Sequence, residues 1–483
     1  MHGLIFNSAT DITFDRTIGA HRVATHMRTL GWDIEIIDFA NFFSFENLCL
    51  FLKSKVKKDT KFIGFSSQFG GWYESYNHLI KKIKLEYPDI ITIVGGHLSQ
   101  IINCKADYFI SGYGENAVIA LLEHYFGNTT HKIIFDKDWL NYNGRKVIRH
   151  ISYPSAPMKS LLIKYEDRDF IQPDEWLSLE FSRGCIFECK FCTFPILGVK
   201  SDYSRDADDM EYQLKDTYDR FGITNYYVAD ETFNDSTAKL RKFSPIFDRL
   251  GFNPLIGGFI RTELLVADSR KEDIDHLLKM NFRMHLYGIE TLNPETAKII
   301  GKSVNTDKLL SKLLDIQKIF KSSGPFRGEM SLIVGLPKDT RETILRGYEW
   351  LKQNWNDQAV VYWPLSLHLD PMVQRPNLLA VEKEKYGYEI IPKTQRKDFV
   401  NFSDYSEIWK NENFTCNEAF YFAKDLNNQL ANDGFKKGFQ ELSKCVRHFN
   451  NLELGLQASK HQHVPNDKFI RNLTLYKEKK LSV

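Results

Sequence analysis

The pattern of apolar and polar positions divides this chain into regions of different secondary structure. In residues 1–130, short β-rich apolar runs alternate with segments whose apolar side chains recur at helical spacing. This alternation predicts an α/β domain with a doubly wound parallel sheet and crossover helices. The expected strands begin at Gly3, Asp33, Lys61, Ile90 and Ala106, and the expected helices begin at Ile18 and Trp72.

The rest of the chain changes pattern twice. Residues 131–172 are irregular and contain an Asn143-Gly144 turn, which predicts a hairpin and a linker. Residues 173–372 show six strand–helix units, the first of which begins near Trp176. Residues 373–483 form a mainly helical cap, with amphipathic helices expected over NEAFYFAKDLNNQLAND and FKKGFQELSKCVRHFNN. The basic residues from Lys460 onward are expected to be a solvated tail.

Composition narrows the possible partners and the compartment. The 64 Lys and Arg residues nearly balance the 62 Asp and Glu residues, which argues against a broad surface for nucleic acid. The sequence from Met1 lacks the layout of a signal peptide, and no apolar run approaches membrane-spanning length. Scattered Cys49, Cys104, Cys416 and Cys445 fit ordinary thiols in a reducing cytoplasm. We therefore expect a cytoplasmic protein without a membrane partner.

Three further cysteines carry the clearest chemistry. Cys185, Cys189 and Cys192 lie in one loop with three and then two residues between them. Thiolates at this spacing can reach three corners of one 4Fe–4S cluster, because soft sulfur ligands suit iron–sulfur clusters. No histidine occurs between His150 and His276 to supply the fourth corner. One iron would then remain open to an exogenous ligand.

The alternatives fit this loop less well. A structural zinc site normally has four protein ligands, a disulfide would leave one thiol over, and inert thiols seldom come three to a loop. Phe187, Phe191 and Phe194 interleave with the cysteines and would shield a cluster from water. Arg183 and Lys190 would offset its negative charge, and both effects tune its potential.

This CxxxCxxC loop, with an aromatic residue directly before its last cysteine, resembles the signature of the radical S-adenosylmethionine (SAM) enzymes. The six strand–helix units that begin there resemble the partial (β/α)6 barrel of that family. The resemblance implies that the open iron binds SAM. It also implies that an electron from the cluster cleaves SAM to methionine and a 5′-deoxyadenosyl radical.

Motifs after the second and third strands match the family's contacts to the amino-acid part of SAM. Asp230 and Glu231 match the position that receives the ammonium group, a charge-assisted contact. Arg261 matches a common arginine that meets the SAM carboxylate. Taken singly, Arg261 could instead be the partner in a structural salt bridge.

Later motifs match the family's contacts to the nucleoside part of SAM. Glu290, in the sequence GIET, matches a residue that hydrogen-bonds the ribose hydroxyls. Gly335, in LIVGLP, matches a segment that packs against adenine, and the backbone near Trp363 would complete the adenine slot. Glu290 could instead be a salt-bridge partner, and Gly335 a simple turn.

Residues 1–130 resemble the cobalamin-binding domain that precedes the barrel in one large class of radical SAM enzymes. The matching pieces are IGAHRVATHMRTLGWDIEIID, VGGHLS and ADYFISGYGENA, and Tyr113 stands where the class usually has an acidic residue. The DxHxxG motif is absent, so no histidine is expected beneath the cobalt. The alternatives are a related domain that has lost its cofactor or a docking module. The residues implied for cobalamin follow the expected strands: Ser66, Ser67, Gly95, Gly96, Gly112 and Glu115.

Together these resemblances imply a cobalamin-dependent methyltransferase that acts on an unactivated carbon. The first alternative is a radical SAM oxidation or rearrangement without methyl transfer from cobalamin. The second is an iron–sulfur electron-transfer protein that performs no SAM chemistry. The expected partners are a small-molecule or peptide substrate and a reductase such as flavodoxin or ferredoxin.

Overall fold

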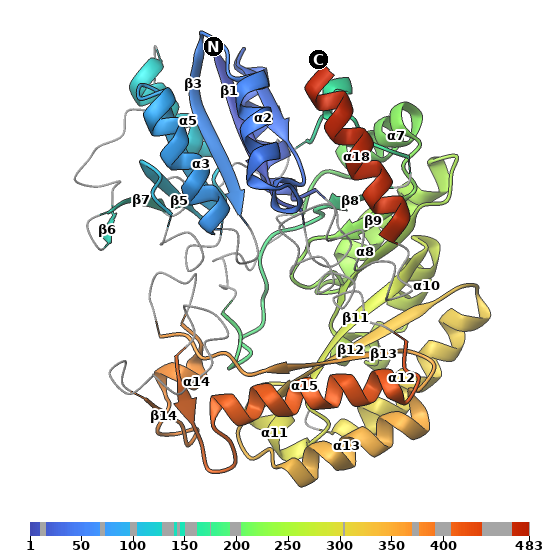
Figure 1. Ribbon diagram of the computed structural model, residues 1–483. Coiled ribbons are helices and arrows are strands. Elements are labelled where there is room, and N and C mark those ends of the chain that lie inside the picture. The colour runs from blue at the N-terminus through green and yellow to red at the C-terminus, as the bar shows by residue number, and fades with distance from the viewer. Residues whose placement is uncertain are drawn as a thin grey trace. The chain divides into compact units, whose positions relative to one another are not determined.

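The computed structural model describes residues 1–9, 16–67, 73–96, 104–127, 140–142, 145–149, 162–173, 175–193, 204–302, 305–369, 376–391, 407–436 and 466–482. The chain forms two compact units (Figure 1). Unit 1 comprises residues 1–178, 212–224 and 440–483, and unit 2 comprises residues 179–211 and 225–439. Each unit contains one main sheet.

The sheet of unit 1 has seven strands in the order β2-β1-β3-β4-β5-β7-β6. Its first five strands pair in parallel, as the sequence pattern predicts. The hairpin expected around Asn143-Gly144 extends this same sheet, because β7 pairs in parallel with β5 and antiparallel with β6. The strands are β1 (His2–Asn7), β2 (Asp33–Ile37), β3 (Thr60–Ser67), β4 (Ile91–Gly96), β5 (Tyr108–Ser111), β6 (Leu140–Tyr142) and β7 (Arg145–Arg149).

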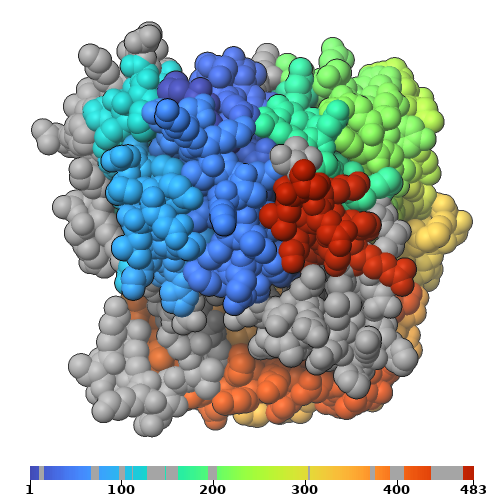
Figure 2. Space-filling view, turned by 45° about the horizontal axis from the view of Figure 1, so that its top comes forward, coloured from blue at the N-terminus to red at the C-terminus, as the bar shows by residue number. Residues whose placement is uncertain are grey.

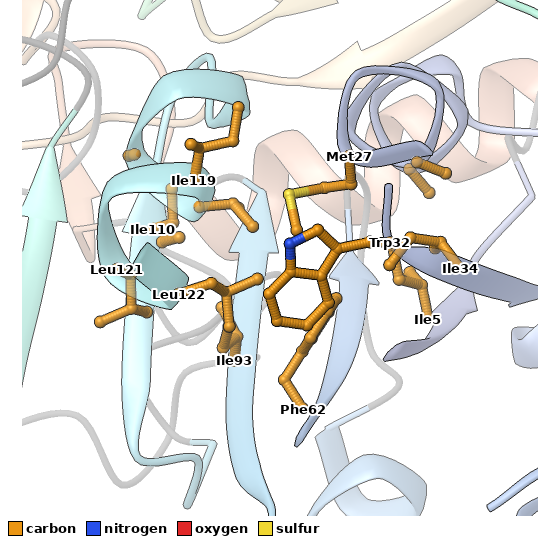
Figure 3. Packing of buried hydrophobic residues seen from close by; sticks show 14 of the residues in the cluster. Ile5, Met27, Trp32, Ile34, Phe62, Ile93, Ile110, Ile119, Leu121 and Leu122 are labelled. Atoms are coloured by element: carbon orange, nitrogen blue, oxygen red, sulfur yellow. The ribbon is translucent and has the colours of Figure 1, made fainter. Parts of the chain in front are cut away.

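Apolar helix faces cover this sheet. The predicted helices α1 (Ile18–Thr29) and α3 (Tyr73–Glu86) are present, together with α2 (Phe45–Lys55), α5 (Glu115–Phe126) and the short η1 (Ala40–Phe42) and η3 (Asp167–Asp169). Figure 3 shows the core beneath α1 and α5, where the Trp32 ring lies between Met27 and Phe62. Trp32 and Phe62 meet edge to face at 5.9 Å between ring centroids, a favourable aromatic geometry.

The end of the chain also belongs to unit 1. Helix α18 (Asn466–Ser482) packs against α2, and Figure 2 shows its red atoms beside the blue atoms of the N-terminal residues. Leu473, Tyr476 and Lys480 form its buried stripe. The Tyr476 hydroxyl accepts the Asp38 backbone N–H at 2.8 Å, and Lys480 donates to Glu35 at 2.6 Å. The expectation of a solvated tail is therefore wrong for these residues, because their 3–4 spacing gives the helix one apolar face.

The sheet of unit 2 has six strands in the order β13-β12-β11-β10-β9-β8, which is also their reverse chain order. This arrangement and the sheet of unit 1 confirm the predicted fold class. The strands are β8 (Trp176–Leu179), β9 (Asn225–Val228), β10 (Leu255–Ile260), β11 (Phe282–Glu290), β12 (Arg327–Val334) and β13 (Ala359–Pro364). The connecting helices are α7 (Ala207–Phe221), α8 (Thr237–Phe243), η4 (Ser244–Arg249), α9 (Thr262–Leu265), η5 (Asp268–Arg270), α10 (Glu272–Lys279), α11 (Pro294–Ile299), α12 (Thr306–Ser322) and α13 (Arg341–Asn354).

Beyond β13, the chain of unit 2 adds α14 (Leu378–Val381), the antiparallel pair β14 (Glu389–Ile390) and β15 (Trp409–Lys410), and α15 (Cys416–Asn432). The predicted amphipathic helix over NEAFYFAKDLNNQLAND is α15, which packs against β12 and β13. Most of the second predicted helix, from Phe435, lies outside the described residues. None of the described helices is both long and apolar enough to cross a membrane.

Candidate active site

The three cysteines lie in the loop that follows β8, at the carboxyl end of its sheet, where α/β proteins place their ligands. Cys189 is buried, whereas Cys185 and Cys192 are half-buried. The Cys192 N–H donates to the Cys189 carbonyl at 3.1 Å, which closes the second half of the loop. Gly184 has a φ of +87°, a conformation that glycine adopts without a Cβ penalty. Phe194 and the residues up to 203 lie outside the described chain.

Asp230 contacts the start of this loop, and both of its carboxylate oxygens accept hydrogen bonds there. Its carboxylate accepts hydrogen bonds from the Phe181 N–H at 2.8 Å and the Ser182 hydroxyl at 2.6 Å. The Lys239 ammonium, on α8, contacts the same carboxylate at 3.3 Å. Burial raises the pKa of Asp230, while Lys239 and Ser182 oppose that shift. The geometry therefore makes Asp230 and Lys239 a buried support for the loop.

Glu231 and Thr232, which directly follow Asp230, also contact the loop. The Glu231 carboxylate accepts the Gly184 N–H at 3.1 Å, and the Thr232 hydroxyl lies 3.6 Å from the Cys185 sulfur. Lys239 also donates to the Thr232 carbonyl at 3.2 Å. The segment after β9 thus supports both the backbone of the cysteine loop and its first thiol.

Arg261, directly after β10, reaches the middle cysteine. Its Nη1 donates to the Cys189 sulfur at 3.3 Å, and its guanidinium carbon lies 3.7 Å from the centre of the Phe187 ring. Its Nη2 donates to the Gly301 carbonyl at 3.2 Å. The structure therefore places this arginine against a predicted cluster ligand.

Glu290 ends β11 in a left-handed conformation, with a φ of +70°. Its carboxylate is buried and lies 3.5 Å from the Lys302 ammonium, which also donates to the Gly288 carbonyl at 2.8 Å. Burial raises the pKa of Glu290, while the charge of Lys302 opposes that shift. A strained backbone at a strand end is typical of functional positions. The charges of Glu263 and Arg261 lie close enough to act on both Glu290 and Lys302.

The region after β13 holds the far side of the cysteine loop. Asn377 is buried, and its amide donates to the Phe191 carbonyl at 3.3 Å and to the Ser366 carbonyl at 2.9 Å. The Leu379 N–H donates to the Lys190 carbonyl at 3.1 Å. The predicted cap therefore begins with a segment that binds the loop backbone directly.

Gly335 and Trp363, the residues predicted to face adenine, lie at the ends of β12 and β13. Gly335 has a φ of +101°, and its carbonyl accepts hydrogen bonds from the Tyr388 hydroxyl at 2.7 Å and from Asn411 at 3.1 Å. The close neighbour that Gly335 admits here is the Trp409 ring. Trp363 is half-buried. Their role toward SAM stays a prediction.

In unit 1, the residues predicted to bind cobalamin meet at one edge of the sheet. Ser66 pairs with Gly95, and Ser67 pairs with Gly96, at the carboxyl ends of β3 and β4. Gly112 follows β5 and has a φ of +85°. Among the described residues, the atom nearest to a Cβ at Gly95 would be the Ile110 carbonyl oxygen, at 3.9 Å.

Other parts of this edge are less fully described. Glu115 is buried in the first turn of α5, and its carboxylate lies 3.8 Å from Arg22. Residues 10–15, 68–72 and 97–103, which carry much of the predicted ligand edge, lie outside the described chain. The role of this edge toward cobalamin stays a prediction.

The donor atoms of the cysteine loop suit an iron–sulfur cluster better than a single ion. In the part of the chain that the structure describes, no three His, Cys, Asp or Glu side chains converge as ligands of one metal ion. A cubane does not need that convergence, because each thiolate binds a different iron. Cys185, Cys189 and Cys192 form no disulfide among the described cysteines.

Sequence reasoning missed three residues that hold the loop. Lys239, Lys302 and Asn377 contact it or its supports, from α8, from the turn after α11 and from the turn before α14. For Asn377 a partial signal existed, because Asn before an apolar run is typical of a helix N-cap. The two lysines carry no comparable signal, since a lysine within about 15 positions of a carboxylate is common on solvated surfaces and only the fold buries these pairs.

Residues 179–351 match the model of the Radical SAM superfamily, and this range contains the cysteine loop, the last residue of β8 and the four strands β9 to β12. Residues 179–351 are a radical SAM domain. The resemblance drawn from the CxxxCxxC loop is confirmed. Within this range, Asp230 and Arg261 follow β9 and β10, and Glu290 ends β11.

Similarity to solved structures extends beyond the radical SAM domain. The fold is similar to that of the radical SAM methyltransferase TsrM from Kitasatospora setae, with a TM-score of 0.65, 13% identity, and coverage of 95% of this chain and 99% of that one. It is also similar to OxsB, a cobalamin-dependent SAM radical enzyme, with a TM-score of 0.60, 13% identity, and coverage of 89% of this chain and 65% of that one. At this identity, both comparisons show a shared fold.

One curated relative is the cytidylyl-2-hydroxyethylphosphonate methyltransferase of Streptomyces wedmorensis. The two are 20% identical over an alignment of 229 residues, and the match covers 39% of this chain and 43% of the relative. The matched region thus spans less than half the length of that enzyme.

Proposed function

We propose that this protein is a cobalamin-dependent radical SAM methyltransferase that acts on an unactivated carbon. The observation that carries the proposal is the cysteine loop of the radical SAM domain, held from three sides by Asp230, Arg261 and Asn377. The similarity of the fold to TsrM, which was solved with cobalamin and a 4Fe–4S cluster bound, supports the proposed use of cobalamin and the proposed methyl transfer.

Cys185, Cys189 and Cys192 are the proposed ligands of a 4Fe–4S cluster. Bound there, the cluster would supply the electron for SAM cleavage. The chain's own contribution is a partly buried loop whose aromatic residues Phe187 and Phe191 limit the access of water. Two positive side chains, Arg261 and Lys302, lie over these rings, 3.7 and 5.7 Å from the ring centres, and offset negative charge.

For SAM we divide the predicted acidic residues by their surroundings. Asp230 supports the loop, because its carboxylate already accepts hydrogen bonds from Phe181 and Ser182. Glu231 is half-buried and is the proposed partner of the SAM ammonium group. Glu290 is the proposed partner of the ribose hydroxyls, because it ends β11 beside Lys302. Gly335 and Trp363 remain the proposed adenine segments.

Cobalamin is proposed to bind along the sheet edge of unit 1. Small residues there allow a close approach of ligand to backbone: a Cβ at Gly95 would be 3.9 Å from its nearest described neighbour, and Gly96 and Gly112 have positive φ angles. Ser66, Ser67 and Glu115 complete the proposed set. OxsB, which shares this fold, has been solved with aqua-cobalamin and SAM bound.

The proposed substrate is a small molecule, as in the TsrM structure with tryptophan bound. A flavodoxin or ferredoxin is the proposed electron donor, since the cluster must gain an electron before it can cleave SAM, and the cytoplasm is the proposed compartment. Nucleic acid is not a proposed partner, because the charges of the chain nearly cancel to a net +2.

Anaerobic reconstitution tests this function. The protein is supplied with iron, sulfide and hydroxocobalamin, desalted, reduced with dithionite and given SAM carrying a labelled methyl group. Retained corrin absorbance, 5′-deoxyadenosine and labelled methylcobalamin are expected. Formation of 5′-deoxyadenosine without corrin retention would instead favour a cobalamin-independent oxidation or rearrangement. A stable cluster that yields neither product would indicate an electron-transfer protein.

A further inference from the structure

The guanidinium of Arg261 is held beside Cys189 by groups other than the cysteine. It stacks on the Phe187 ring at 3.7 Å, donates to the Gly301 carbonyl at 3.2 Å, and pairs through Nε with Glu263 at 3.4 Å. The position of the guanidinium therefore does not depend on the thiol that it meets.

The backbone of Arg261 is fixed as well. Its N–H donates to the Asn234 side chain at 2.8 Å, and the Asn234 amide returns a hydrogen bond to the Arg261 carbonyl at 3.0 Å. Asn234 is itself fully buried. A pinned backbone and a planar, stacked head group leave this arginine little freedom to turn away from Cys189.

Three of the guanidinium's donors already have partners. Nη1 faces the Cys189 sulfur at 3.3 Å, Nη2 faces Gly301, and Nε faces Glu263. The side chain is only 10% exposed. Arg261 is thus better placed to bind a cysteine ligand than to bind the carboxylate of SAM, the role that the family resemblance implies.

We propose that Arg261 tunes the cluster through an N–H···S hydrogen bond to Cys189, which makes the cluster easier to reduce. This inference rests on the proposed function, since it needs a cluster on the loop. Reduction adds one negative charge to the cluster and its thiolates. A cationic donor at one ligand stabilises that added charge, because hydrogen bonds to the sulfurs are among the determinants of cluster potential. Arg261 would thus act on the cluster through Cys189 and not by contact with the reacting atoms.

The experiment is a redox titration of the reconstituted protein, followed by electron paramagnetic resonance in the absence of SAM. Arg261→Met removes the charge and the donor, and Arg261→Gln removes the charge but keeps an N–H donor with a shorter reach. Arg283→Met is the matched control, because Arg283 binds Asn281, Phe320 and Ser323. Iron and sulfide are quantified for every variant.

Arg261→Met should lower the equilibrium constant for one-electron reduction at least tenfold, which shifts the potential by about 59 mV to more negative values. Arg261→Gln should shift it in the same direction, and Arg283→Met should match the unmodified protein. An unchanged SAM-free potential in Arg261→Met, with a full cluster and weaker SAM binding, would make Arg261 a SAM ligand and overturn the proposal.

Two other results would also overturn it. If neither Arg261 variant assembles a cluster while Arg283→Met does, Arg261 is a structural part of the loop. If Arg261→Met and Arg283→Met shift the potential equally, the effect is one of net charge. Failure of the unmodified protein to assemble any cluster would overturn the proposed function itself, a result that is distinct from all of these.

Discussion

The indole of Trp409 lies on Gly335, in the space that a side chain at position 335 would fill. A Cβ there would overlap the ring and stand 3.0 Å from its Cζ2 atom. The Trp409 N–H donates to the Leu365 carbonyl at 3.1 Å, and Trp409 is fully buried. The region after β13 is thereby locked to the ends of β12 and β13.

This contact predicts that Gly335→Ala destabilises the protein. The left-handed φ of +101° strains any L-residue by about 1–3 kcal/mol, and the overlap with Trp409 adds to that cost. Urea unfolding of the metal-free protein measures the loss. In a double-mutant cycle with Trp409→Phe, part of the loss should be recovered, because the smaller ring leaves more room. Strictly additive effects would show that the two positions do not interact.

The cluster prediction concerns each cysteine of the loop. Cys185→Ala, Cys189→Ala and Cys192→Ala should each abolish the brown chromophore and the formation of 5′-deoxyadenosine, because a cubane needs all three thiolates. Cys49→Ala is the control, since Cys49 is a half-buried thiol on α2 in unit 1. Unchanged iron content in the three loop variants would refute the assignment.

A separate prediction concerns the buried pair under the loop. Asp230→Ala should lower the free energy of unfolding by about 1–3 kcal/mol, because it leaves the buried Phe181 N–H and Ser182 hydroxyl without their acceptor. It also removes one of the two carboxylates that pair with Lys239, the other being Asp235 at 2.7 Å. Asp315→Ala is the control, as it removes an exposed carboxylate paired with Lys318 and should change stability little. A variant with unchanged stability but weakened SAM binding would make Asp230 a ligand of the SAM ammonium.

A pH dependence follows from Asp339, which is buried and accepts hydrogen bonds from Thr291, Asn293 and Thr296. Burial raises the pKa of Asp339 from 3.8 to about 6. Between these values the folded state binds a proton that the unfolded state has lost, so stability falls as pH rises. The urea midpoint of the unmodified protein should therefore fall, relative to that of Asp339→Asn, from pH 4 to about pH 6. Above that pH the difference between the two midpoints should stay constant. A difference that is flat across this range would contradict the raised pKa.

The cobalamin edge can be tested sterically. Gly95→Phe should abolish corrin retention after desalting, while cluster assembly and SAM cleavage persist. Among the described residues, the atom nearest to a Cβ at Gly95 is the Ile110 carbonyl oxygen, at the ordinary contact distance of 3.9 Å. Leu85→Phe, at a position that is 75% exposed at the end of α3, is the control. Corrin bound equally well by both variants would place the cofactor elsewhere.

Local patterns in the sequence were enough to predict both parallel sheets, helix α15 and the cysteine loop. Strand and helix periodicities repeat within a few residues, and the cysteines lie within one loop, so neighbouring residues alone reveal them. The same reasoning could not separate Asp230 from Glu231. Both are carboxylates that follow one strand, and both accept hydrogen bonds from the cysteine loop. Only the fold shows that Asp230 is buried against Phe181 and Ser182 while Glu231 is half-buried.

The tertiary structure decided the contacts between distant parts of the chain. Helix α18 returns to unit 1, where Tyr476 meets the backbone of Asp38, and Trp409 closes over Gly335. Arg261 reaches Cys189 in the same way, across 72 positions of sequence. Such pairs leave no periodic signal, because each depends on the packing of whole elements and on the burial that packing creates.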